Sequence, residues 1–265
     1  MTKPKVIFFG NGLLAETVFN ALKDNVEIIF CAKQKEDLEQ TIQIMRNKEQ
    51  KVYGVLASFG VIIPNSVLEL FEPEGIINVH PSYLPDLRGP SPIETAMLRG
   101  DTEFGVSVMK LVEKMDAGPI YYQEKIAMDK FAQKSEIYER LGECGGKWVA
   151  ENLTQLPKPV EQNGEATYSK MLDTKMARLR PAEQTAEEML DQIRAFIHFP
   201  KTRIEVKGLD CIVLSAHLSN EPEPIKGHTE LSLKGKDGLY LIIDEIQPAG
   251  KKAMGAAAFA NGYLK

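Results

Sequence analysis

Asn78, His80 and Asp116 are the residues of this sequence whose types and spacing could do chemistry together. Positions 78 and 80 lie two apart in the apolar run IINVH, and on a strand such residues project from the same face. An amide donor beside an imidazole can bind a carbonyl oxygen and protonate it as negative charge builds up. Asp116, in KMDAGP, follows another apolar strand, and a carboxylate near a histidine fixes its tautomer and raises its basicity. Taken singly, the three could also be a turn asparagine, a surface histidine and an Asx cap.

The elements that must position these residues alternate between strand and helix. Short apolar runs predict strands at four places: 5–9, 26–31, 52–58 and 75–79. Segments with apolar residues at helical spacing lie between them: 13–23, 36–51 and 64–71. This alternation predicts an α/β fold with a doubly wound, mostly parallel sheet, whose ligands bind at the carboxyl ends of the strands. We therefore expect the three polar residues at one edge of the sheet.

The rest of the chain divides into three stretches. A helix, a hairpin and a long helix complete a first domain, residues 1–165, at 93–99, 105–126 and 135–156. Breaker residues followed by basic, polar sequence predict a linker at residues 166–181. Residues 182–265 form a C-terminal domain with one amphipathic helix and several short strands with glycine turns, which predict a small OB-like β-barrel.

Composition limits the class of function. The 265 residues include 32 lysines and arginines against 37 acidic residues, a net charge of −5, so nucleic-acid binding would need a local basic patch. Cys31, Cys144 and Cys211 are too far apart for a disulfide framework or a zinc cluster, and no metal site is expected. No apolar run reaches the roughly 18 residues of a membrane span, and MTKPKVIFFGNG is typical of a first strand rather than a signal peptide. We expect a cytoplasmic monomer that does not attach to a membrane.

Longer motifs add a resemblance to a known family. The segments NVHPSYLP, RGPSPIETAMLRGD, FGVSVMKL and MDAGPI are similar to the active-site region of the formyltransferases that use 10-formyltetrahydrofolate. SFGVIIP at 58–64 resembles the folate-pocket strand and loop of that family. ATYSKML, IRAFIHFP and IQPAGKKAMGAAAFANGY look like its linker, second domain and closing segment. The likeness extends over nearly the whole chain and implies a folate-dependent formyltransferase.

The resemblance also implies a role for each residue of the site. Asn78 and His80 would stabilise the oxyanion and handle protons, and Asp116 would be their acid–base partner. The co-substrate would be 10-formyltetrahydrofolate, with no metal. Tyr83 stands where the family carries leucine in its folate-binding loop. The residues implied in cofactor binding are Ser82, Tyr83, Leu84, Pro85 and Gly89.

The acceptor implied by the closest members of the family is aminoacylated initiator tRNA, whose methionyl amino group would be formylated for translation initiation. Only residues 33–51 separate the second and third strands, where such members carry a long basic loop. A sugar-nucleotide N-formyltransferase therefore remains the alternative, although the ending IQPAGKKAMGAAAF favours the tRNA enzyme. The candidates for tRNA binding are Lys170, Arg178, Arg180, Lys251 and Lys252.

Two other classes of protein fit less well. Gly10-Asn11-Gly12 opens a G-x-G-x-x-A motif, but the second strand ends without the acidic residue that a dinucleotide-binding fold uses for the ribose. A non-enzymatic RNA-binding protein would explain the basic residues and the barrel. It would leave Asn78, His80 and Asp116 without a task.

Overall fold

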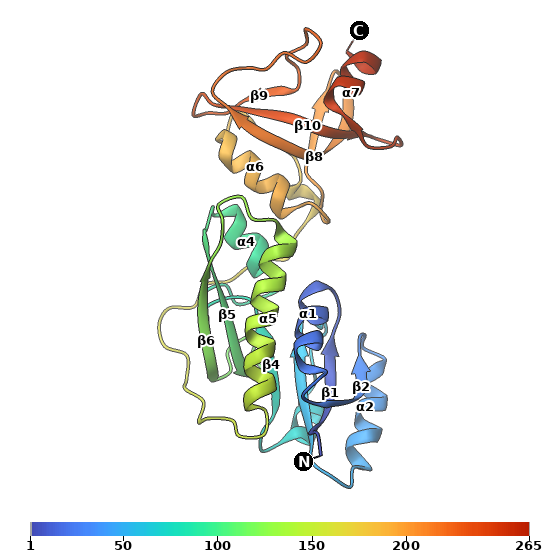
Figure 1. Ribbon diagram of the computed structural model, residues 1–265, viewed down its shortest axis with the longest axis vertical. Helices are drawn as coiled ribbons and strands as arrows, with labels where there is room; N and C mark the ends of the chain where they lie inside the picture. Colours follow the sequence, from blue (N-terminus) through green and yellow to red (C-terminus); the bar gives the residue numbers. More distant parts are fainter. Residues whose placement is uncertain (1, 265) are drawn as a thin grey trace. The chain divides into compact units, whose positions relative to one another are not determined.

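The computed structural model describes residues 2–264 of the chain (Figure 1). Its residues group into two compact units. The first holds the chain up to residue 93 and then residues 102–170; the second holds residues 94–101 and the chain from residue 171. The division by sequence into residues 1–165, 166–181 and 182–265 stays a prediction. No helix in the described part of the chain is long and apolar enough to cross a membrane.

The first unit is built on a six-stranded sheet in the order β2-β1-β3-β4-β5-β6. The strands are β1 Lys5–Gly10, β2 Glu27–Ala32, β3 Val52–Ala57, β4 Ile76–His80, β5 Glu103–Lys110 and β6 Ile120–Ala127. β1 pairs in parallel with β2 and β3, and β3 with β4, whereas β5 is antiparallel to both β4 and β6. The sheet is therefore mixed: β5 runs against the other five strands, which share one direction. A short connection such as that between β5 and β6 can join only antiparallel neighbours.

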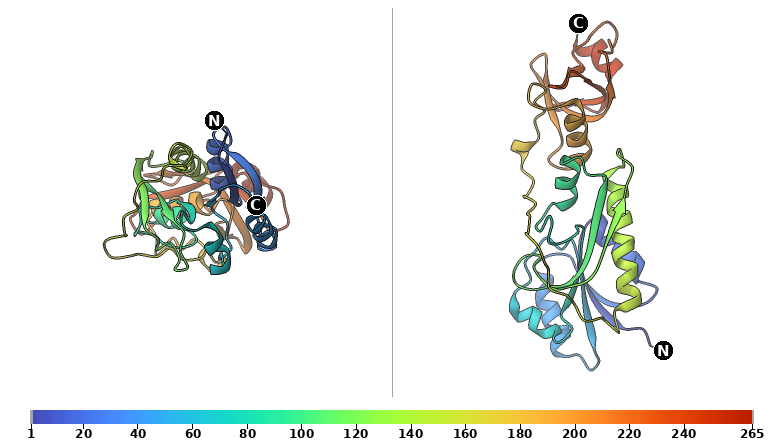
Figure 2. Two further views of the ribbon diagram at one scale, coloured as in Figure 1. Left: turned by 90° about the horizontal axis from the view of Figure 1, so that it is seen from below. Right: turned by 90° about the vertical axis from the view of Figure 1, so that its left-hand side faces the viewer.

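Helices cover both faces of this sheet, as the doubly wound pattern predicts. They are α1 Leu13–Leu22, α2 Asp37–Arg46, α3 Asn65–Leu68, the 3₁₀ turn η1 Glu69–Phe71, α4 Pro92–Leu98 and α5 Lys134–Asn152. α1 packs on α5, while α2 packs on α3 and η1. Figure 2 shows α5 on one side of the sheet and the segment of α3 and η1 on the other. α4 begins in the first unit and continues in the second.

Side chains alternate between the two faces of the sheet along each strand, so the first unit has a core on each face. Phe8 of β1 meets Phe19 of α1 edge-on, with ring centroids 5.7 Å apart. Its neighbour Phe9 points to the other face, into the cluster that contains the buried side chains of α2 and α3. Ile76 of β4 belongs to the same cluster, so residues 78 and 80 continue that face. The catalytic candidates of β4 therefore lie on the face opposite α5.

From residue 171 on, the described part of the second unit combines an antiparallel sheet with helices. Its elements are η2 Thr174–Met176, α6 Ala186–Ala195, β7 Arg203–Val206, β8 Leu209–Ser219, β9 Ser232–Lys234, β10 Tyr240–Pro248, β11 Met254–Gly255 and α7 Ala256–Tyr263. The strand order is β11-β10-β8-β7, and β9 pairs with β10. Over the described residues this order has two ends, so the OB-like barrel stays a prediction. α7, which the sequence did not predict, inserts Phe259 into the core between α6 and the sheet.

Candidate active site

β4 delivers Asn78 and His80 to one buried face of the sheet. The two residues are 4% and 6% exposed. His80 Nε2 lies 3.2 Å from the Leu87 carbonyl oxygen. Because a carbonyl only accepts, Nε2 is the donor, and Nδ1 is the nitrogen that faces Asp116. Among the described residues none hydrogen-bonds the Asn78 amide, so its donors are available to a substrate.

Asp116 comes to this site from a turn after β5. Its Oδ1 lies 3.7 Å from His80 Nδ1, and its Oδ2 accepts a hydrogen bond of 2.8 Å from the Gly89 N–H. The structure thus brings the three predicted residues together, but the expected reason was wrong. β5 runs antiparallel to β4, with Lys110 opposite Ile77, so its carboxyl end lies at the other edge of the sheet. The chain reaches His80 only because the segment after β5 turns back.

Side chains of β5 and β6 form hydrogen bonds with the backbone of the predicted cofactor loop. The Ser107 hydroxyl donates to the Ser82 carbonyl at 2.6 Å and accepts from the Leu84 N–H at 3.0 Å. Gln123 Nε2 donates to the Leu84 carbonyl at 2.8 Å. Gly105 of β5 permits this contact, because a Cβ there would lie 2.3 Å from the Tyr83 nitrogen. The loop backbone is therefore fixed before any ligand binds.

The other residues implied in cofactor binding, Tyr83, Pro85 and Gly89, differ in their surroundings. Tyr83 is 41% exposed, and Lys125 Nζ lies 5.2 Å from the centre of its ring. Pro85 follows Leu84 through a cis peptide bond. Gly89 has a φ of 111°, and a Cβ there would lie 2.8 Å from the Ser169 carbonyl oxygen. Packing against Ser169 accounts for this glycine, and its contact with a cofactor stays a prediction.

A further pair of residues holds the Asp116 turn, and sequence reasoning missed its role. Gln162 donates from Nε2 to the carbonyls of Asp116 and Gly118, each at 2.8 Å, and its Oε1 accepts from Arg88 Nη2 at 2.6 Å. In the sequence, Gln162-Asn163-Gly164 predicts only a break in regular structure before the linker. Gln162 and Asp116 are 46 residues apart, so no local sequence pattern indicates that they are in contact.

Two protein-family models match this chain and together identify its family. The formyl transferase model matches residues 13–153, and the model of the formyl transferase C-terminal domain matches residues 172–264. The chain belongs to the formyl transferase family. It is therefore an enzyme of the formyltransferase class, and the resemblance inferred from its motifs is confirmed.

Curated relatives of this formyltransferase carry one name. The methionyl-tRNA formyltransferase of Mesoplasma florum is 30% identical over 258 residues, covering 92% of this chain and 79% of the relative. That of Thermus thermophilus is 30% identical over 302 residues, covering 98% and 96%. The chain thus spans most of the length of both relatives.

Solved structures share the fold of this formyltransferase. HypX from Aquifex aeolicus in complex with tetrahydrofolic acid has a TM-score of 0.77 at 18% identity; the match covers this whole chain but about half, 48%, of HypX. Methionyl-tRNA formyltransferase from Clostridium thermocellum has a TM-score of 0.67 at 22% identity, covering 82% and 94%. The N-formyltransferase from Helicobacter canadensis, in complex with folinic acid and dTDP-3-aminofucose, has a TM-score of 0.66 at 19% identity, covering 94% and 100%.

The tRNA-binding candidates of the formyltransferase lie at several places. Arg178 pairs with Asp210 at 3.3 Å, and Arg180 with Glu183 at 3.3 Å. The Asp210 carbonyl also accepts from the Ala249 N–H at 3.0 Å, two residues before Lys251. Arg203, and then Arg178, hold the pKa of the Asp210 carboxyl below its ordinary value. Lys170 is exposed at the end of the first unit.

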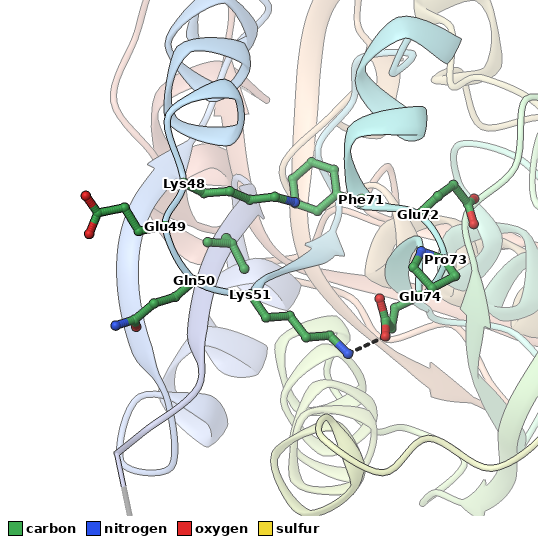
Figure 3. A pocket seen from close by; sticks show the side chains of 9 residues that line it. Lys48, Glu49, Gln50, Lys51, Phe71, Glu72, Pro73 and Glu74 are labelled. Atoms are coloured by element: carbon green, nitrogen blue, oxygen red, sulfur yellow. Dashed lines mark hydrogen bonds and ion pairs between the residues drawn. The ribbon is translucent and has the colours of Figure 1, made fainter.

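Other chemistries find little support in the described residues. Burial raises the pKa of all three thiols, in Cys144 to about 11 with the help of Glu124, so they stay protonated at neutral pH. Nowhere between residues 2 and 264 do three potential metal-ligating side chains form a group. A pocket of about 410 Å³ lies at the amino ends of β3 and β4, away from Asn78 (Figure 3). Its Lys51 and Glu74 pair with each other.

Proposed function

We propose that this formyltransferase transfers the formyl group of 10-formyltetrahydrofolate to the amino group of methionyl-tRNA, as a monomer in the cytoplasm. The name shared by its curated relatives supports the acceptor. The observation that carries the chemistry is the Asn78 amide, which has no hydrogen-bond partner in the described chain, beside the His80–Asp116 pair. The amide is neither bonded to another described residue nor sealed from solvent, so its N–H donors can reach a formyl oxygen at this point.

Each residue of the site then has one task. 10-Formyltetrahydrofolate supplies the formyl carbon, which the amine nitrogen attacks. Asn78 donates an N–H to the formyl oxygen as it becomes negative, and His80 adds a second donor by exchanging its 3.2 Å contact with Leu87 for that oxygen. Asp116 takes the proton that the amine loses, and His80 Nδ1 can relay it toward the leaving nitrogen of the folate.

The same proposal assigns the co-substrate to the loop that follows β4. Ser82, Leu84 and Gln123 form a hydrogen-bonded frame with Ser107, which keeps the loop backbone in place. A preformed frame lowers the entropy cost of binding a flexible ligand. Tyr83 and Pro85 are the side chains of this loop proposed to contact the folate, with Gly89 at its far end.

The second domain would dock the tRNA. We expect its antiparallel sheet to form an OB-like barrel. Its candidate phosphate ligands are Arg178, which pairs with Asp210, and Lys251 and Lys252, in the turn that follows Ala249. Arg180 of the second unit and Lys170 of the first unit are the remaining proposed phosphate ligands. Lysine and arginine contacts to phosphates supply most of the affinity for a nucleic acid and make it salt-dependent.

A sugar-nucleotide amine is the second candidate acceptor. The Helicobacter canadensis neighbour binds dTDP-3-aminofucose. In this chain α2, Asp37–Arg46, occupies most of the segment between β2 and β3, so no long basic loop is available there for tRNA. This observation favours the alternative, whereas the curated relatives favour methionyl-tRNA.

The deciding experiment offers formyl-labelled 10-formyltetrahydrofolate with methionyl-tRNA and, separately, with amino-sugar nucleotides. We expect label on methionyl-tRNA. Asn78→Ala and His80→Ala should each lower kcat about 10²- to 10³-fold with folate binding kept, and Asp116→Asn at least as much. Label on the sugar alone would refute the acceptor, and full activity of Asp116→Asn would remove that carboxylate from the mechanism.

A further inference from the structure

The turn that carries Asp116 needs support from elsewhere in the chain. Asp116 has a φ of 48°, in the left-handed region that non-glycine residues seldom occupy. Within the turn the Ala117 N–H donates to the Lys114 carbonyl at 3.2 Å, which closes it only loosely. The preceding residue, Met115, is 53% exposed and adds little packing. Contacts from a distant segment must therefore keep the Asp116 carboxylate in place.

Gln162 provides these contacts with all the donors of its amide. Both hydrogens of Nε2 are used, on the carbonyls of Asp116 and Gly118, each at 2.8 Å. Oε1 accepts from Arg88 Nε at 3.1 Å and Nη2 at 2.6 Å. Carbonyls only accept and a guanidinium only donates, so the orientation of this amide is unambiguous. Gln162 itself is anchored by the pairing of Val160 with Ile120, at 2.7 and 2.8 Å.

Arg88 connects this amide to the other side of the site. It is 8% exposed and lies between Leu87, whose carbonyl meets His80, and Gly89, whose N–H holds the Asp116 carboxylate. Three consecutive residues thus contact His80, Gln162 and Asp116 in turn. Gln162 links residues 87–89 to the Asp116 turn. It therefore sets the distance between the Asp116 carboxylate and the His80 imidazole.

We propose that Gln162 is a positioning residue for formyl transfer. It touches neither the imidazole of His80 nor the carboxylate of Asp116. It acts by holding the left-handed backbone at Asp116 against Arg88, so that Oδ2 meets the Gly89 N–H and Oδ1 faces the ring. The inference rests on the proposed function for the reaction it serves, while the structural link it asserts can be measured without substrate.

Two substitutions separate the hydrogen bonds that Gln162 donates to the turn from those that it accepts from Arg88. Gln162→Met keeps the length of the side chain and removes every hydrogen bond. Gln162→Glu keeps an acceptor for Arg88 but cannot donate to the carbonyls of the turn. Both should lower kcat about 10- to 100-fold, with KM for folate and acceptor within about threefold of wild type, because a displacement near 1 Å costs that much. Gln155→Met is the matched control, since the Gln155 side chain is exposed near the end of α5.

A double-mutant cycle tests whether the effect passes through Asp116. In an Asp116→Asn background, Gln162→Met should cost less than about threefold in kcat, because the group it positions has been changed. Full additivity of the two losses would overturn the proposal. So would a kcat within twofold of wild type in Gln162→Met, or an equal loss in Gln155→Met.

Hydrogen exchange in the ligand-free full-length protein keeps the test independent of the acceptor. Gln162→Met and Gln162→Glu should speed amide exchange in peptides covering residues 114–119 at least about tenfold, while Gln155→Met leaves them unchanged. Unchanged exchange in the Gln162 variants would refute the link even if the wild type formylates nothing. Faster exchange together with no transfer to methionyl-tRNA would refute the proposed function alone.

Discussion

Replacing Gly118 by alanine should misplace the catalytic carboxylate by a distance that follows from the structure. A Cβ at this position would lie 1.8 Å from the Lys110 carbonyl oxygen, and real Cβ atoms stay at least 3.0 Å from such atoms, so the turn must move by about 1.2 Å. Lys110 is paired with Ile77 of β4 and cannot yield. Asp116 lies two residues before Gly118 and would move with it. Since a 1 Å misplacement costs about 10² in rate, we expect kcat to fall about 100-fold, or about 2.7 kcal/mol.

The assay is single-turnover formyl transfer, measured well below the unfolding temperature, with folate binding followed separately. Gly262→Ala is the control, because nothing lies within 4 Å of a Cβ at that position near the end of α7. It should leave kcat unchanged. A Gly118→Ala enzyme with wild-type kcat and Tm would show that the carboxylate does not depend on this turn, and the reasoning would fail.

Three further predictions concern the second domain. Arg178 and Arg180, both changed to alanine, should raise KM for tRNA and flatten its salt dependence by about 0.9 per lost phosphate contact, with KM for folate unchanged; an unaltered salt slope would mark them as solvated charges. Asp244, through its hydrogen bond, raises the pKa of His217 above its ordinary value, so the stability from this pair is full below about pH 6.5 and is lost as pH rises through the raised value. The Tm advantage of wild type over His217→Gln should therefore shrink as the pH rises above about 6.5; an advantage that stays constant with pH would refute this coupling. Thr185 caps α6 in a capping box, and Thr185→Ala should cost about 1 kcal/mol in urea unfolding; an unchanged midpoint would show that the cap is dispensable.

Local patterns were enough to predict most elements of the fold. Strand β1 begins at the predicted residue 5, and α1 and α5 lie within a few residues of their predicted bounds, 13–23 and 135–156. The face shared by Asn78 and His80 follows from the period of two along β4. Each of these features depends on neighbours a few residues away, which a sequence displays directly. The helix α7 was missed because its alanine-rich segment shows no apolar stripe at helical spacing.

The sequence by itself determined which residue types could act on a formyl group and which strand presents two of them. Only the tertiary structure decided how the third arrives. Asp116 was expected at the carboxyl end of its strand, on the same edge of the sheet as Asn78 and His80. β5 instead runs antiparallel to β4, and the carboxylate reaches His80 through a turn held by Gln162. The hydrogen bond between Gln162 and Asp116 joins residues 46 positions apart, and the one between Gln162 and Arg88 joins residues 74 positions apart. Contacts of this kind arise from strand order and loop closure in three dimensions, so no local period in the chain encodes them.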